Sequence, residues 1–358
     1  MVGLLSLAQL IPLVLTALLG GALADHYNRR TLMIIAEISL AIGCLLFALN
    51  AMLPTPRIWI IFLTSAYMSV FIGLHWPAVG GLIQQIVDKD DFSSVGALSS
   101  FMYSSGMIAG PTIGGLIIAH FGLVTTYFID FSSFIVSLAA LSQLRNIRRA
   151  ANDSKKISAW ISIKEGFFYA FSRKELLGSY LIDFVAMIFG MPTALFPAIA
   201  QSFGGVEVLG MLYSAPAVGS LIISLFSGWT KHIKKYGIAI SVSALLWGIA
   251  IIFFGLATNL WIALLFLALA GALDTISGIF RSVMWNESIP NEFRSRLAGI
   301  EIICVLSGPK LGDTEAGLVA AAFGVTASVV SGGILCVIGV IACCYLLPKF
   351  WGYKSETV

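Results

Sequence analysis

The chain has 358 residues, of which 58% are hydrophobic and 11% are charged, and its formal net charge is +3. Soluble domains average about 25% charged residues, so this composition excludes an ordinary soluble domain and indicates an integral membrane protein. The apolar runs are far longer than the ~10 residues of a transmembrane strand, so they predict an all-α helical bundle and exclude a β-barrel.

The polar residues offer few patterns that are typical of chemistry. The cysteines all lie in apolar runs without metal-ligand spacing, so we interpret them as small buried hydrophobes. No phosphate-binding loop occurs, which argues against ATP-driven transport, and no nucleophile–base constellation stands out. We therefore expect no enzyme activity, no metal, no cofactor and no nucleic-acid partner.

Apolar runs of about 20 residues or more predict about eleven transmembrane helices. One longer polar break, residues 145–175, separates an N-terminal half (1–144, five spans) from a C-terminal half (176–358, six spans and a short tail) and is expected to be a cytoplasmic linker. The expected spans are 2–24, 31–53, 58–87, 94–120, 123–144, 177–203, 207–229, 236–257, 260–285, 297–320 and 323–347.

The lysines and arginines outside the spans are distributed unevenly. If Arg29 and Arg30 are placed in the cytoplasm and the spans alternate, the opposite side receives only Arg57. Such asymmetry is typical of cytoplasmic loops in multi-pass membrane proteins. It predicts a cytoplasmic C-terminus and places Met1 on the outer side.

A short polar turn joins the first two spans. Its Gly21, Asp25, Arg29 and Arg30 match a signature of the major facilitator superfamily, in which a loop between helices 2 and 3 carries Gly, Asp and paired basic residues. A histidine and an asparagine replace the first basic residue and the second glycine of that signature. The resemblance implies that these four residues form a conformational latch between the cytoplasmic ends of the two halves. The alternative is an ordinary cytoplasmic turn.

Members of this superfamily have twelve spans in two sets of six and begin in the cytoplasm. This sequence resembles such a transporter without helix 1, and either a truncated reading frame or a genuine eleven-span protein explains the difference. A short internal repeat supports two related halves, because the run of residues 110–114 (GPTIG) is similar to residues 308–312 (GPKLG). We number the spans 2 to 12 on this basis.

Helix 5 contains a run rich in glycine. Gly106, Gly110 and Gly114 share one face at four-residue spacing, which lets a neighbouring helix approach closely. Pro111 removes a backbone donor and bends the helix, and Gly115 completes the run. The run resembles the Gly-Pro motif of helix 5 in proton-coupled exporters. The alternative is a packing seam without any role in export.

Ionisable residues inside a membrane are costly and mark candidate sites. In the superfamily, helices 1, 4, 7 and 10 line the central cavity, where this chain offers His75, Asp183, Asp274 and Arg281. Asp274 and Arg281 are seven residues apart and share a face, and we expect Arg281 to pair with Asp183 at similar depth. Because burial favours a neutral carboxyl group, Asp274, and secondarily Asp183, is a candidate carrier of the coupling proton. His75 is another, unless it forms a static packing pair.

Other ionisable residues within the spans are expected to be structural. Lys310 and Asp313 are three residues apart on helix 11 and can neutralise each other. Glu37 and Asp130 lie on helices 3 and 6, which are peripheral in the superfamily.

The resemblance covers nearly the whole chain and points to a bacterial branch that exports siderophores. Runs 20–25 and 110–116, and Gly312-Asp313 with Gly317, carry it. It implies a monomer in the bacterial inner membrane that exports a small molecule by alternating access, driven by the proton gradient. The alternatives are a broad drug exporter of the same fold and a membrane protein that no longer transports, because one cavity wall is absent.

Overall fold

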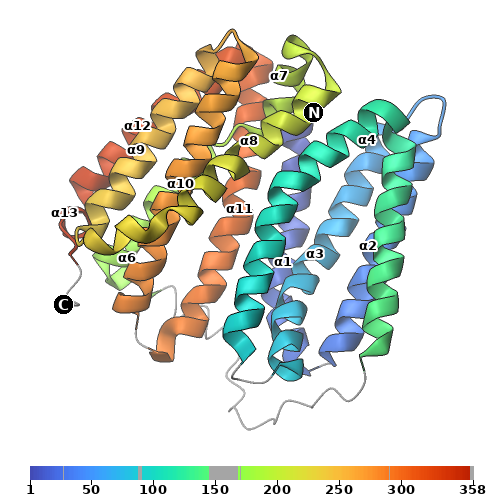
Figure 1. Cartoon of the computed structure of the whole chain (residues 1–358), viewed down its shortest axis with the longest axis horizontal. Coiled ribbons are helices and arrows are strands. Elements are labelled where there is room, and N and C mark those ends of the chain that lie inside the picture. The colour runs from blue at the N-terminus through green and yellow to red at the C-terminus, as the bar shows by residue number, and fades with distance from the viewer. Residues whose placement is uncertain (27, 88–90, 145–167, 170, 290, 355–358) are drawn as a thin grey trace. The chain divides into compact units, whose positions relative to one another are not determined.

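The computed structural model describes residues 1–358 except for 27, 88–90, 145–167, 170, 290 and 355–358. The described part is built from helices joined by short connections, without a strand (Figure 1). Eight helical stretches within it are long and apolar enough to cross a bilayer. The sequence prediction of an all-α membrane protein is therefore confirmed.

The first half of the chain contributes four helices. They are α1 (Val2–His26), α2 (Arg29–Ala51), α3 (Ile58–Ile86) and α4 (Phe92–Gln143). The long α4 is two helices in sequence, because Gly122 has φ 79° and ψ 170°, a left-handed conformation that glycine adopts without a steric penalty. The predicted boundary between spans 94–120 and 123–144 falls at this kink.

The second half begins with a helix that the sequence predicted as one continuous span over residues 177–203. One apolar stretch, Lys174–Phe203, is long enough to cross the membrane there, but its helix stops at Phe189 and resumes after Pro192. The elements in order are α6 (Lys174–Phe189), η2 (Thr193–Leu195), α7 (Phe196–Phe203), α8 (Val206–Leu225), η3 (Ser227–His232), α9 (Tyr236–Leu256), α10 (Leu260–Ser288), α11 (Asn291–Phe323), α12 (Val325–Leu346) and α13 (Pro348–Trp351).

The chain forms two compact units. The first comprises Met1–Leu4, Ser104–Gly115 and Ser162–Val358, and the second comprises Leu5–Tyr103 and Leu116–Ile161. The core of the first unit is contributed by all of its long helices and includes the fully buried rings of Phe196, Phe280 and Phe350. The core of the second unit includes a cluster of described residues from α2, α3 and the end of α4, namely Leu32, Met33, Ala78, Leu82 and Leu141.

Within the first unit, α8 and α10 approach each other through glycines. A Cβ atom at Gly219 would overlap the carbonyl oxygen of Ala268, and one at Gly271 would overlap that of Pro216. Small residues permit such close approach between membrane helices. The Ser220 hydroxyl then donates a hydrogen bond across the seam to the Gly271 carbonyl at 3.0 Å. This seam fixes α10 against α8 just before the polar residues of α10 begin.

Candidate substrate and proton site

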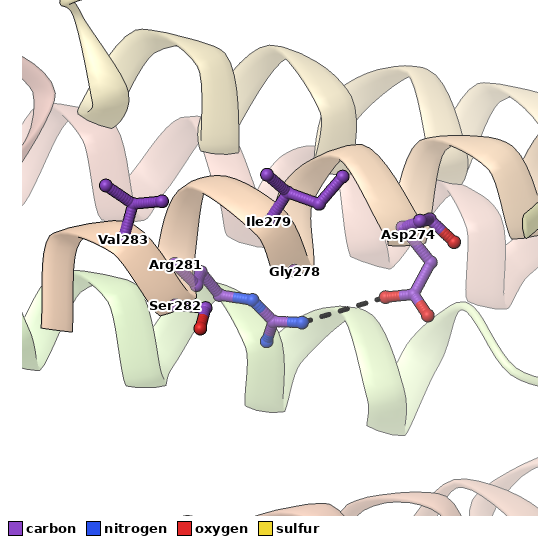
Figure 2. Close-up of a pocket in the computed structure, with 7 residues that line it drawn as sticks. Asp274, Gly278, Ile279, Arg281, Ser282 and Val283 are labelled. Carbon is purple, nitrogen blue, oxygen red and sulfur yellow. Dashed lines mark ion pairs between the residues drawn. The ribbon is translucent and has the colours of Figure 1, made fainter. Parts of the chain in front are cut away.

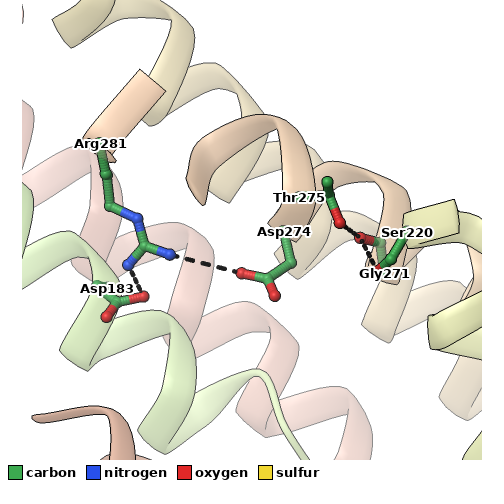
Figure 3. A network of polar contacts seen from close by, with 6 residues as sticks. All are labelled: Asp183, Ser220, Gly271, Asp274, Thr275 and Arg281. Carbon is green, nitrogen blue, oxygen red and sulfur yellow. Dashed lines mark hydrogen bonds and ion pairs between the residues drawn. The ribbon is translucent and has the colours of Figure 1, made fainter. Parts of the chain in front are cut away.

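The centre of the site is an arginine that lies between two carboxylates. The Arg281 guanidinium of α10 forms an ion pair with Asp183 of α6, and its other terminal nitrogen lies 3.7 Å from Oδ1 of Asp274 (Figure 3). Asp274 and Arg281 are two turns apart on one face of α10, so one side chain reaches along the helix to the other. The predicted pairing of Asp183 with Arg281 is confirmed.

An aromatic contact one turn further along supports this arrangement. The Trp285 ring stacks on Tyr180 with 4.8 Å between ring centroids, and its Nε1–H donates to the Ser179 hydroxyl at 3.1 Å. Arg281 and Trp285 are four residues apart on α10, and therefore lie on the same face. The two helices are thus joined at two successive levels, one charged and one aromatic.

On the other side of Asp274, the seam with α8 fixes the backbone. The Thr275 hydroxyl donates to the Gly271 carbonyl at 3.0 Å, and the same oxygen accepts the bond from Ser220 (Figure 3). Contacts therefore hold α10 on both sides of Asp274, with α8 at Gly271 and with α6 at Arg281 and Trp285.

The three charged side chains differ in exposure. The exposed fractions are 8% for Asp183, 12% for Arg281 and 38% for Asp274. Because the arginine stays protonated, two ionised carboxylates and one guanidinium give the cluster a net charge of −1. One proton on Asp274, the accessible carboxylate, would make the cluster neutral.

An open pocket of about 480 Å³ lies beside this cluster, a size suited to a small molecule (Figure 2). Its lining comes from one face of α10 and combines charged, hydroxyl and aliphatic groups. The lining residues are Asp274, Thr275, Gly278, Ile279, Arg281, Ser282 and Val283. Among the described residues, no group of three or more His, Cys, Asp or Glu side chains is placed to hold a metal ion.

His75 lies in the second unit and has a partner there. Its Nε2 lies 3.1 Å from Oε1 of Glu37, so α3 and α2 share a buried acid–base pair. The exposed fractions are 27% for the His75 side chain and 9% for that of Glu37. This geometry favours the static-pair alternative for His75, and it involves a glutamate that the sequence analysis ranked as peripheral.

A heptad pattern on α2 was the signal that could have found this pair. Arg30, Glu37 and Cys44 are spaced by seven residues and lie along one face of α2. Glu37 binds His75, and the Cys44 thiol donates to Oδ2 of Asp130 at 3.0 Å. The polar residues of α2 thus form a stripe that packs against α3 and α4.

Of the four predicted latch residues, the structure places the two arginines on α2. Arg30 donates from Nε to the Leu141 carbonyl at 3.0 Å and from a terminal nitrogen to the Ser142 carbonyl at 2.8 Å. These carbonyls lie at the C-terminal end of α4, where a cation is favoured. Gly21 and Asp25 lie in α1, but the Asp25 side chain and its surroundings are outside the described residues, so the latch stays a prediction.

Within the first unit, the glycine run of α4 meets α8 through Gly115. A Cβ atom at Gly106, Gly110 or Gly114 would meet no described atom within 4 Å, whereas one at Gly115 would lie 3.1 Å from the Cα of Gly210 in α8. On the same face, a Cβ at Gly210 would lie 2.7 Å from the carbonyl oxygen of Pro111. Spacing alone identified a smooth face but not the helix that packs on it.

The chain is similar in sequence to known proteins. A family model described as transmembrane secretion effector matches residues 1–354. Two curated relatives are the enterobactin exporters EntS of Shigella boydii and of Escherichia coli O1:K1, each 27% identical over 332 residues, which cover 90% of this chain and 78% of the relative.

Solved structures of membrane transporters share the fold. A mutant of the nucleoside transporter NupG superposes with a TM-score of 0.76 at 15% identity, covering 96% of this chain and 90% of that one. The D-xylose-proton symporter gives 0.75 at 15% identity, covering 99% and 89%. A mutant of the peptide transporter POT gives 0.77 at 12% identity, covering 99% and 87%.

Proposed function

Since this chain belongs to the transmembrane secretion effector family of the major facilitator superfamily, we propose that it exports a small molecule across the bacterial inner membrane in exchange for protons. The chain is a membrane transporter and not an enzyme. The observation that carries the proposal is the cluster of Asp183, Arg281 and Asp274, with net charge −1 and one accessible carboxylate beside a pocket.

The charge of the cluster supplies the coupling. An ionised cluster of net charge −1 is unfavourable in a low-dielectric membrane interior, and either a proton or a hydrogen-bond donor of the substrate on Asp274 relieves it. We infer that Asp274 receives a proton while the site faces outward and releases it to the cytoplasm when substrate binds there. Arg281 and Asp183 stay paired and hold Asp274 in place.

The finer proposal is that the substrate is a siderophore. The curated relatives are enterobactin exporters, and the pocket combines an acceptor carboxylate, the Ser282 hydroxyl and the aliphatic Ile279 and Val283. Such a lining suits a molecule that carries hydroxyl groups on an apolar frame. The latch of Gly21, Asp25, Arg29 and Arg30 would close the cytoplasmic side in this cycle.

Secretion by a bacterial strain that lacks its own siderophore exporter tests the function. The strain carries either this chain, its Asp274→Asn variant or an empty vector, and chelators inside and outside the cells are measured by mass spectrometry under iron limitation. We expect this chain to move a chelator from the cells to the medium and Asp274→Asn to lose the proton-driven part of that movement. No change in any iron chelator would remove the siderophore proposal.

The proton coupling is tested separately in proteoliposomes. Enterobactin is the probe, and its uptake is compared with and without an imposed pH gradient. Uptake that ignores the gradient would contradict proton exchange. If cells with this chain tolerate many unrelated drugs better than cells with the empty vector, and chelator secretion does not change, a broad drug exporter would be favoured.

A further inference from the structure

The helix that carries Asp183 is interrupted shortly after that residue. α6 ends at Phe189, and its last regular bond is the one from the Gly190 N–H to the Ala186 carbonyl at 2.7 Å. Pro192 follows in the break, and proline has no N–H to continue a helix. The chain then resumes as η2 and α7, so residues on the two sides of the break belong to separate helical pieces.

A carboxylate from another helix holds the start of the second piece. Oδ1 of Asp313 in α11 accepts hydrogen bonds from the Thr193 hydroxyl at 2.5 Å and from the Ala194 N–H at 2.7 Å. Backbone N–H groups in the first turn of a helix lack partners within that helix, so an outside acceptor is needed here. The Tyr213 hydroxyl of α8 also donates to the Thr193 carbonyl at 3.4 Å.

The same stretch of α11 also seats the end of α6. A Cβ atom at Gly312 would lie 2.5 Å from the carbonyl oxygen of Met187 and 2.8 Å from that of Ile188. A Cβ at Gly308 would lie 2.9 Å from the Cβ of Met187. α11 therefore contacts both sides of the break, the end of α6 through glycine and the start of η2 through Asp313.

We propose that Asp313 is a positioning residue for transport, whose carboxylate clasps the start of η2 and α7 onto α11 while residues 190–192 bend during the cycle. Hinges in domain movements are short segments that absorb backbone rotation, and residues 190–192 are such a segment between two helical pieces. The end of α6 packs on α11 through glycine, whereas the start of η2 is hydrogen-bonded to α11 through Asp313. In this proposal Gly312 seats the end of α6, and Asp313 holds the start of η2.

Matched variants separate the clasp from the charge of Asp313. Asp313→Asn keeps an oxygen that accepts both bonds, whereas Asp313→Ala removes it. Likewise Thr193→Ser keeps the hydroxyl donor, and Thr193→Val removes it without changing the shape of the side chain. Lys310, three residues before Asp313, interacts electrostatically with the Asp313 carboxylate. Of the two Asp313 variants, only Asp313→Asn removes the negative charge while it keeps the hydrogen-bond acceptor.

The readout is the accessibility of α7 in the purified full-length chain. Ala200 is buried in α7 and Ala263 is fully buried in α10, so Ala200→Cys reports on α7 and Ala263→Cys on global unfolding. Both are made in a background without native cysteines and labelled with a water-soluble maleimide. Thr193→Val should raise labelling at Ala200→Cys about fivefold, because it removes one hydrogen bond worth about that factor. Asp313→Ala should raise it further, because it removes both bonds to the carboxylate.

The control pair and the double variant decide the outcome. Asp313→Asn and Thr193→Ser should label like the parent, and Ala263→Cys should stay protected. Asp313→Ala with Thr193→Val together should label like Asp313→Ala alone, since that variant already removes the bond that Thr193→Val removes. Asp313→Asn behaving like Asp313→Ala, labelling that rises at Ala263→Cys as well, or labelling that no variant changes would each overturn the proposal.

The transport consequence rests on the proposed export function and is measured apart from labelling. In the secretion assay, Asp313→Ala should lower the export rate while Asp313→Asn retains it. If the chain exports no chelator, the proposed function fails but the labelling result still decides whether Asp313 positions α7. If export is normal in Asp313→Ala, the positioning role in transport fails while the proposed function stands.

Discussion

The two buried charge sites of this protein differ in the cation that each one uses. In the first unit Arg281 serves two carboxylates, and in the second unit His75 serves the single carboxylate of Glu37. Arginine keeps its charge at every accessible pH, so the first site has a charge of −1 until it gains a proton. The second site is likewise neutral when it holds one proton, whichever of its two groups carries that proton.

The surroundings of the two sites, and not their charge counts, assign them different roles in the proposed cycle. The first site can exchange its proton for a substrate, because Asp274 lines the pocket. The second site offers no such exchange, because neither Glu37 nor His75 lines that pocket. We therefore expect proton exchange at Asp274 and a constant, structural pair at Glu37 and His75.

Exposure separates the two sites in the same direction. At the first site the accessible group is the Asp274 carboxylate, and at the second it is the His75 imidazole, while Oε2 of Glu37 is buried with no hydrogen-bond partner among the described residues. Among the described residues, the Glu37 carboxylate thus depends on His75 for its hydrogen bond. At each site, substitution of one residue should therefore lower stability strongly and substitution of another only slightly.

The largest expected effect follows removal of the arginine. Arg281→Gln leaves Asp183 and Asp274 together without their cation, and breaking a buried pair in this way costs about 3–5 kcal/mol. We expect thermal unfolding in detergent at a markedly lower temperature. The double variant Asp183→Asn with Arg281→Gln should recover most of the loss, and failure to recover would show that packing, not charge, explains it.

Removal of the histidine should have the second-largest effect. His75→Leu leaves one buried carboxylate without its partner, against two at the first site, and an unsatisfied buried group costs about 1–3 kcal/mol. The measurement is again the unfolding temperature. Glu37→Gln in the same background should restore stability, and proton-driven transport by the double variant should resemble that of the unmodified chain. Loss of gradient dependence in that variant would break the distinction between the sites.

Much of the first site was predictable from the sequence. Hydropathy located the helices, and the rule that charges inside a membrane need partners led from Asp183 to Arg281 because both lie at similar depth. The Glu37–His75 pair was not found, since it requires knowing which faces of α2 and α3 meet. The heptad stripe on α2 held part of that information.

The break after α6 illustrates a different limit. Gly190 and Pro192 interrupt helical hydrogen bonding, but the surrounding residues stay apolar, so a hydropathy criterion sees one span across 177–203. Similarly, the spacing of Gly106, Gly110 and Gly114 describes a smooth surface, whereas the contact with α8 is made by Gly115. The residue spacing shows that a helix face is smooth enough for close packing, but only the tertiary structure shows which helix packs on which face.

Removal of the hydrogen bond between Trp285 and Ser179, which supports the first site, should lower stability by a smaller amount. Trp285→Phe keeps a ring that can stack on Tyr180 but loses the donor to Ser179, and a single hydrogen bond is worth about 1 kcal/mol. The unfolding temperature should fall slightly. Ser179→Ala should match it, because it removes the acceptor of the same bond, and the double variant should not exceed either single variant by much.

The smallest effect on stability, and the most informative, is expected at Asp274. Its side chain is 38% exposed and lies 3.7 Å from the guanidinium, so Asp274→Asn should change stability by no more than about 1 kcal/mol, as for exposed ion pairs. Its effect on coupling should be complete, because the variant cluster of one carboxylate and one guanidinium is already neutral and has no reason to bind a proton. Enterobactin movement in proteoliposomes should then be independent of an imposed pH gradient. If the Asp274→Asn variant still follows the gradient while Glu37→Gln does not, the proton-exchanging site is the histidine pair of the second unit, and the assignment drawn from the pocket and the exposed carboxylate is reversed.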